Sequence, residues 1–163
     1  MKTLLRTLLY LTIIVWLGAE VFFPVVAAVT FTTLRPDTHA AGAIVGHLLR
    51  ILHGMGLVSG MVLLALLLLA PAFGVYRPRI ALAAMIPVVL MIALTSFAQF
   101  VIIPSMERDR IAAGGAIDTT APENPYTAHF NKLHNRSENV EGAVLLLGLV
   151  SVVLIAVAET RKP

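Results

Sequence analysis

The sequence predicts an all-α protein, a four-helix transmembrane bundle with a long outer loop between its third and fourth helices. Its 163 residues are 58% hydrophobic and only 13% charged, too few charges to cover a water-soluble domain, in which about a quarter of residues are charged. Four separate stretches are long and apolar enough to cross the roughly 30 Å hydrocarbon core of a bilayer. Each must be helical, because lipid offers an unpaired backbone no hydrogen-bond partner.

The first two spans are predicted at 8–30 and 45–72. The first contains Glu20, and its apolar run is longer than the core of a secretory signal, so we expect it to remain in the mature chain. The apolar stretch that includes the second span is too long for one crossing, because about 34 residues at 1.5 Å each reach about 50 Å. We therefore expect this helix to extend beyond the bilayer or to bend at Gly54-Met55-Gly56.

The other two spans are predicted at 80–103 and 137–158. A tight turn at 70–79 separates the second span from the third. The connection at 105–136 is rich in charges, glycine and proline, so we expect a partly ordered surface loop there. No repeat divides the chain, and all 163 residues (1–163) are expected to form a single four-span membrane domain.

Lysine and arginine predict the orientation. Four spans place both termini on one side, and that side carries six basic residues close to span ends, where the positive-inside rule applies most strongly: Lys2, Arg6, Arg77, Arg79, Arg161 and Lys162. The other side carries five: Arg35, Arg108, Arg110, Lys132 and Arg136. We predict a bacterial inner-membrane protein with cytoplasmic termini. Its net charge of +3 fits membrane orientation better than nucleic-acid binding.

Polar residues collect in the outer half of every predicted span. Ionisable side chains are costly inside a bilayer and usually face the bundle interior, so we expect them to meet in one site near the outer face. The residues of this predicted site are Glu20 in the first span, His47, Arg50 and His53 in the second, Gln99 in the third, and His134, Glu138, Asn139 and Glu141 at the start of the fourth.

Helical spacing adds detail to this prediction. At 100° per residue, the helix of the second span presents Arg50 and His53 on the same face as three glycines, Gly42, Gly46 and Gly60. The helix of the fourth span presents His134, Glu138 and Glu141 on one face. Glycines four residues apart are typical of close helix contacts in membranes. We expect packing against a neighbouring helix at two such pairs, Gly42 with Gly46 and Gly56 with Gly60.

Several short motifs occur in a characteristic order: Trp16-Leu17-Gly18, Phe22-Phe23-Pro24, Ala41-Gly42, Val45-Gly46, Gln99 and Leu133-His134. Over most of its length the chain thereby resembles the transmembrane protein 205-like family, a domain of unknown function found in bacteria and eukaryotes. That family looks distantly like the CopD copper-resistance membrane domains and related haem-associated four-helix proteins. The resemblance implies four membrane helices and no established reaction.

Metal or haem binding is the function we favour from the sequence. Two imidazoles on facing helices, His53 and His134, could be the axial ligands of a haem b. With carboxylates nearby, the same region could instead hold a transition-metal ion. The predicted ligands are His53, His134, Glu20, Glu138, Glu141 and His47, and the supporting polar residues are Arg50, Gln99 and Asn139.

Two other function classes stay open. The polar residues could bind a small cation or relay protons in a proton-coupled transporter. Alternatively, the chain could be a structural or assembly subunit of a larger membrane complex, in which Glu20 and Arg50 only fix the helix register. The partners we consider are the lipid bilayer, a second copy of the chain or other membrane subunits. The sequence carries no signature of a hydrolase, kinase or dinucleotide-dependent enzyme, which favours a non-enzymatic function.

Overall fold

The computed structural model describes residues 1–115, 117, 120–121 and 123–160 of the chain, and these residues form helices and no strand. Within these residues, four helices are long and apolar enough to cross a membrane. The predicted all-α, four-span fold class is therefore confirmed. The loop prediction includes Pro122 and the orientation count includes Arg161 and Lys162, and these three residues lie outside the described part of the chain.

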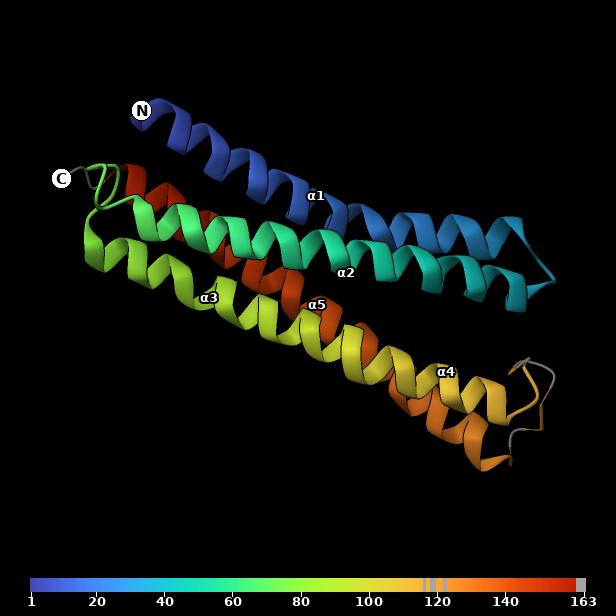
Figure 1. The fold of residues 1–163 in the computed structure, drawn as a ribbon. Helices are drawn as coiled ribbons and strands as arrows, with labels where there is room; N and C mark the ends of the chain where they lie inside the picture. Colours follow the sequence, from blue (N-terminus) through green and yellow to red (C-terminus); the bar gives the residue numbers. More distant parts are fainter. Residues whose placement is uncertain (116, 118–119, 122, 161–163) are drawn as a thin grey trace.

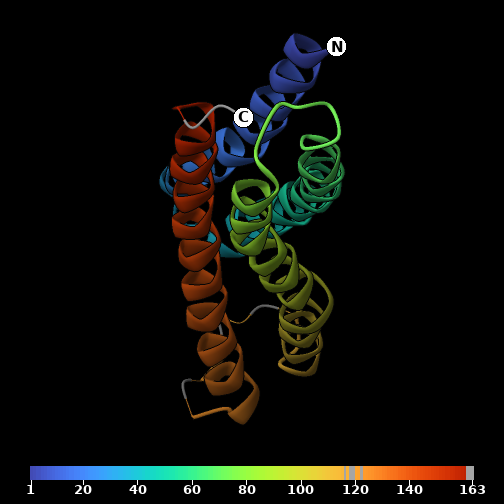
Figure 2. The same cartoon turned by 90° about the vertical axis from the view of Figure 1, so that its left-hand side faces the viewer.

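The four membrane helices form two antiparallel hairpins (Figure 1). In the first, α1 (Lys2–Thr33) packs against α2 (Thr38–Leu69). In the second, a continuous rod packs against the returning helix, and both termini lie at the same end of the molecule (Figures 1 and 2). The rod consists of α3 (Pro78–Phe97), the π-helical segment η1 (Ala98–Ile102) and α4 (Ile103–Ala112), and the returning helix is α5 (Pro125–Thr160).

The helices are longer than the predicted spans. α5 begins at Pro125, twelve residues before the predicted start at 137, because Pro is favoured in a first turn. The side chain of Asn124 accepts a hydrogen bond from the backbone N–H of Tyr126 at 2.9 Å, which satisfies a free donor of that turn. Hydropathy shows which part of a helix is apolar but not where the helix ends. The connection predicted at 105–136 is therefore shorter in the structure, where it runs from 113 to 124.

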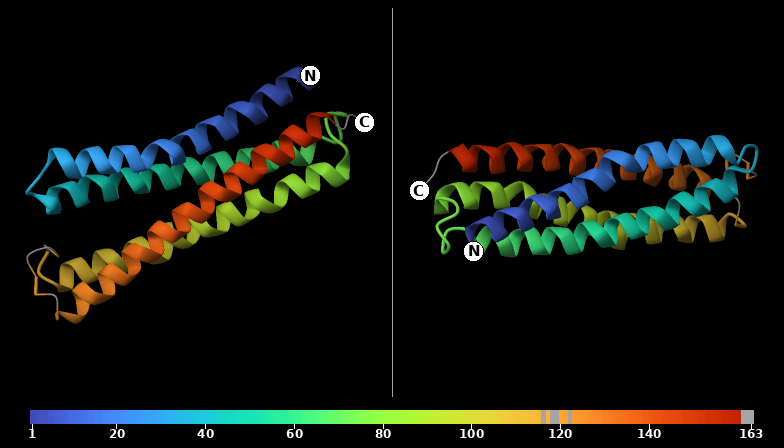
Figure 3. Two further views of the ribbon diagram at one scale, coloured as in Figure 1. Left: turned by 180° about the vertical axis from the view of Figure 1, so that it is seen from behind. Right: turned by 90° about the horizontal axis from the view of Figure 1, so that it is seen from above.

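The two hairpins share a core only in the half of the molecule nearer the termini. Toward the other end, the α1–α2 hairpin and the α4–α5 hairpin diverge (Figures 1 and 3). Buried apolar side chains from all four membrane helices fill the shared half, among them Leu9, Trp16, Leu63, Met91 and Val144. Residues that share a helix face can therefore have different surroundings, depending on their level along the helix.

The two predicted glycine pairs illustrate this difference. A Cβ atom added at Gly56 would lie 2.6 Å from Nε1 of Trp16, and one at Gly60 would lie 2.8 Å from Cζ3 of the same indole. These two glycines thus provide the space that the Trp16 ring occupies. By contrast, a Cβ atom at Gly42 or Gly46 would meet no atom within 4 Å, because these residues lie where the hairpins have diverged. The prediction that Gly42 and Gly46 pack closely against a neighbouring helix is therefore wrong.

We predict that Gly60→Ala lowers the free energy of unfolding by about 1–3 kcal/mol, the usual cost of overpacking a core. The new methyl group would also lie 2.6 Å from Cγ1 of Ile92, so it is confined on two sides. Unfolding by denaturant in detergent measures the effect. The matched control is Gly54→Ala, where no atom lies within 4 Å and no loss of stability is expected. Equal stability of the two variants would contradict the packing around Trp16.

Candidate functional site

A buried imidazole lies at the middle of the candidate site. His53 of α2 has no exposed surface. Its Nδ1 lies 3.0 Å from Oε1 of Gln99 in η1, and its Nε2 lies 2.8 Å from Oε1 of Glu141 in α5. One histidine thus joins three of the four membrane helices through both of its ring nitrogens.

The fourth helix, α1, supplies a second carboxylate. Glu20 is only 4% exposed and accepts a hydrogen bond from Nε1 of Trp16, one turn earlier, at 3.2 Å. Glu20 lies within range of electrostatic interaction with Glu141 and His53. We call these five residues, Trp16, Glu20, His53, Gln99 and Glu141, the polar centre.

The contact between His53 and Glu141 requires a proton. Neither an unprotonated ring nitrogen nor a carboxylate oxygen can donate a hydrogen bond. Because the amide oxygen of Gln99 can only accept a hydrogen bond, Nδ1 of His53 carries one proton and donates it to that oxygen. The second proton, shared with Glu141, is either on Nε2, giving an imidazolium beside a carboxylate, or on Oε1, giving a neutral imidazole beside a carboxylic acid. The pair is neutral overall in both arrangements, so the proton can shift between the two atoms without changing the net charge that the bilayer must accommodate.

The π-helical segment helps to position the amide of Gln99. Single-turn π segments inside α-helices are frequent at functional sites, and this one lies where α3 continues into α4. Two further side-chain oxygens at or near the centre are buried. They are Oε2 of Glu141 and Oγ1 of Thr95, one turn before Gln99, and neither has a hydrogen-bond partner in the described part of the chain. The centre can therefore form further hydrogen bonds.

Other residues of the predicted site lie outside the polar centre. His134 and Glu138 are 3.3 Å apart on the surface of α5, with side chains 53% and 67% exposed. They share a face with Glu141, but they lie at the level where the hairpins have diverged. His47, Arg50 and Asn139 are exposed as well. Glu20 and Arg50, considered together in the structural-subunit alternative, have different partners. Glu20 accepts a hydrogen bond from Trp16, whereas the electrostatic influence of Arg50 falls on Glu107.

Two groups of polar contacts were missing from the sequence analysis. Near the termini, Tyr76 donates a hydrogen bond to Oε1 of Glu159 at 2.8 Å, and Nε of Arg6 lies 3.3 Å from the same oxygen. Burial and this hydrogen bond raise the pKa of Tyr76 above its ordinary value, so the phenol remains a donor. At the opposite end, Nδ1 of His129 lies 2.7 Å from Oδ2 of Asp109. The sequence signal that could have predicted these contacts is the presence of oppositely charged residues at the ends of neighbouring helices.

The arrangement does not fit a metal ion or an axial haem ligand. Both nitrogens of His53 are engaged by protein side chains, and a metal or haem iron would need one of them free. Within the described residues, no three His, Cys, Asp or Glu side chains are grouped so that they could hold a metal ion.

A protein-family model matches residues 11–111, which is more than half of the chain, and its description is Domain of unknown function (DUF4149). The chain belongs to the DUF4149 family. No curated protein and no solved structure matches it. The DUF4149 match runs from α1 to α4 and so contains Glu20, His53 and Gln99, whereas Glu141 lies beyond it on α5.

Proposed function

We propose that this integral membrane protein relays protons across the membrane and that the polar centre is its proton-binding site. The observation that carries the proposal is the position of His53, which is buried between Gln99 and Glu141 from two other membrane helices. Ionisable residues held inside a membrane bundle commonly mark ion pathways and proton relays.

The composition of the centre supports this function. The pair formed by His53 and Glu141 shares one proton between two atoms, and Glu20 adds a second carboxyl group within range of electrostatic interaction with both. Adding or removing a proton changes which of these groups attract and which repel. Because the groups come from different helices, such a change alters the forces between the two hairpins.

Polar groups continue from the centre toward the end that carries the termini. Along α5, Ser151 lies ten residues beyond Glu141, about 15 Å, and Glu159 lies eight residues further, about 12 Å. Ser151 is fully buried, and Ser59 of α2 is also buried in this half of the molecule. These separations exceed one hydrogen bond, so proton movement along this route requires transient water between the groups.

Proton flux into liposomes tests the proposal. The purified protein is reconstituted into potassium-loaded liposomes that contain a pH-sensitive dye, and valinomycin then creates a membrane potential. We expect faster acidification of the lumen than in protein-free liposomes. Glu141→Gln keeps the size of the side chain but removes its ability to hold the shared proton, so flux is expected to fall to the protein-free level.

The matched control for this experiment is Glu138→Gln, three residues away on the same helix but 67% exposed. It should transport protons as the wild type does. Circular dichroism and gel filtration verify that both variants are folded. Flux that is no faster with wild-type protein than without it, or that is unchanged in Glu141→Gln, would refute the proposal.

The other functions predicted from the sequence have less support. A haem or metal-binding role, and with it the resemblance to CopD-like domains, finds no suitable ligand set among the described residues. A structural or assembly role remains consistent with a buried centre that joins four helices. It predicts that Glu141→Gln alters stability or association with a second copy or partner subunit and that proton flux is absent even with the wild type.

We also propose that the protein lies in a bacterial inner membrane with both termini in the cytoplasm. The termini share one end of the molecule with the turn at 70–77 (Figure 1), and Lys2, Arg6, Arg77 and Arg79 lie at this end.

The chain contains no cysteine, so single cysteines report the orientation without background. In intact cells, Arg79→Cys should resist a membrane-impermeant maleimide, whereas His39→Cys, in the first turn of α2 at the opposite end of the molecule, should react. The reverse labelling pattern would contradict the orientation.

A further inference from the structure

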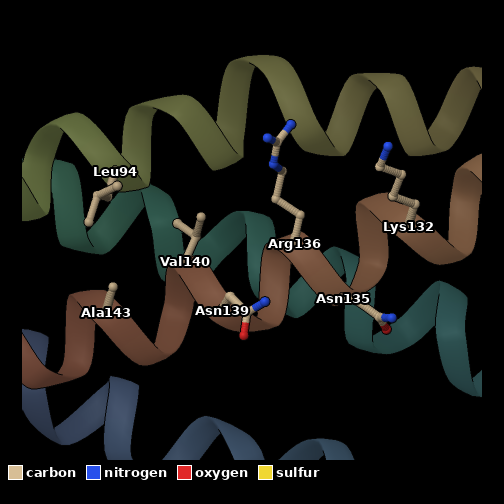
Figure 4. Close-up of a pocket in the computed structure, with 7 residues that line it drawn as sticks. All are labelled: Leu94, Lys132, Asn135, Arg136, Asn139, Val140 and Ala143. Atoms are coloured by element: carbon tan, nitrogen blue, oxygen red, sulfur yellow. The ribbon is translucent and has the colours of Figure 1, made fainter.

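A groove runs along the side of α5, between this helix and α3. Its lining combines two basic side chains, two amides and an apolar floor. The residues that line it are Leu94, Lys132, Asn135, Arg136, Asn139, Val140 and Ala143. Figure 4 shows Lys132, Arg136 and Val140 directed from one face of α5 toward the α3–α4 rod, with Leu94 of α3 directed back toward α5.

The position of the groove matches the boundary between hydrocarbon and headgroups. The long apolar stretch of α5 begins at Val140. Arg136 lies four residues beyond it, about 6 Å, and Lys132 about 12 Å. The headgroup region on each side of a bilayer is about 5–7 Å thick, so the guanidinium lies at headgroup level. The longer reach of Lys132 allows its ammonium group to bend back toward the same level.

The two basic side chains are available for an external anion. Both are exposed, and neither forms an ion pair with another residue in the described part of the chain. The acidic residue nearest in the sequence, Glu138, lies about 160–200° around α5 from Arg136 and contacts His134 instead. The groove is therefore positively charged at its outer part and apolar at its inner part.

We propose that this groove binds the headgroup of an anionic phospholipid. Arg136 and Lys132 bind the phosphate, since a guanidinium can donate two parallel hydrogen bonds to phosphate oxygens. The amides of Asn135 and Asn139 offer donors and acceptors to the rest of the headgroup. One acyl chain lies over Leu94, Val140 and Ala143, and this apolar floor selects a lipid over a dissolved phosphate.

Native mass spectrometry tests this site on the full chain. The protein is released from micelles that contain equal amounts of phosphatidylglycerol and phosphatidylcholine, and the bound lipids are counted. We expect the wild type to retain phosphatidylglycerol preferentially. Lys132→Gln combined with Arg136→Gln should weaken that binding by about thirtyfold, from the usual contribution of two basic residues at an anionic surface.

The matched control is Arg35→Gln combined with Arg108→Gln. It removes the same charge from exposed residues on the same side of the membrane that do not line the groove, and it should retain phosphatidylglycerol as the wild type does. Equal retention of the two lipids, wild-type retention by the groove variant, or full displacement of the lipid by inorganic phosphate would overturn the proposal.

Discussion

Replacing His53 by alanine is expected to lower the free energy of unfolding by about 3–5 kcal/mol, the usual cost of removing one partner from a buried charged pair. The imidazole has no exposed surface and occupies both Oε1 of Gln99 and Oε1 of Glu141. Its removal leaves these two oxygens without their shared partner and opens a cavity between three helices. Unfolding by denaturant in detergent measures the loss.

The control for this variant is His134→Ala. It removes the same side chain from α5, where the imidazole is 53% exposed, pairs with the exposed Glu138 and stacks on the ring of Phe130. We expect this change to stay within about 0.5 kcal/mol of the wild type. If the two histidine variants lose the same stability, the assignment of His53 to a buried centre is wrong.

Trp16→Ala is expected to cost about 3–5 kcal/mol, as for other large-to-small substitutions in a core. The indole is 1% exposed, lies against Gly56 and Gly60 of α2, and donates to Glu20. The change therefore removes both the packing between α1 and α2 and a hydrogen-bond donor of the polar centre. Thermal unfolding in detergent gives the size of the effect.

A second substitution separates these two contributions of Trp16. Trp16→Phe keeps most of the ring but leaves Glu20 without its N–H donor, at an expected cost of about 1–3 kcal/mol. Phe22→Ala is the control, because Phe22 belongs to the same helix but is 62% exposed. A small effect of Trp16→Ala, comparable to that of Phe22→Ala, would contradict the close contact between α1 and α2.

Hydropathy was sufficient to predict the four membrane helices and the fold class, because a bilayer requires long apolar helices. It also indicated which polar residues are unusual: Glu20, His53 and Glu141 stand in or next to apolar runs, and the structure brings these three together. The predicted helix ends were less accurate, since polar helical turns such as those after Pro125 carry no hydropathy signal.

The divergence of the two hairpins explains most of what the sequence could not predict. Periodicity assigns a residue to a face of its helix but does not reveal whether another helix lies opposite that face at that level. Gly46 and His53 share a face of α2, yet only His53 is buried; on α5, Glu141 approaches the centre while His134 remains exposed. Likewise, the indole of Trp16 packs against Gly56, whereas no side chain lies against Gly42, and periodicity alone does not predict this difference.

A double-mutant cycle between His53 and Glu141 tests most directly the claim that the polar groups meet in one buried centre. Stability is measured for His53→Ala, Glu141→Ala and the double variant, and the same cycle is made for the exposed pair His134 and Glu138. We predict a coupling energy of about 1–3 kcal/mol for the buried pair and at most about 0.5 kcal/mol for the exposed one. Additive effects of His53→Ala and Glu141→Ala would contradict the existence of the centre.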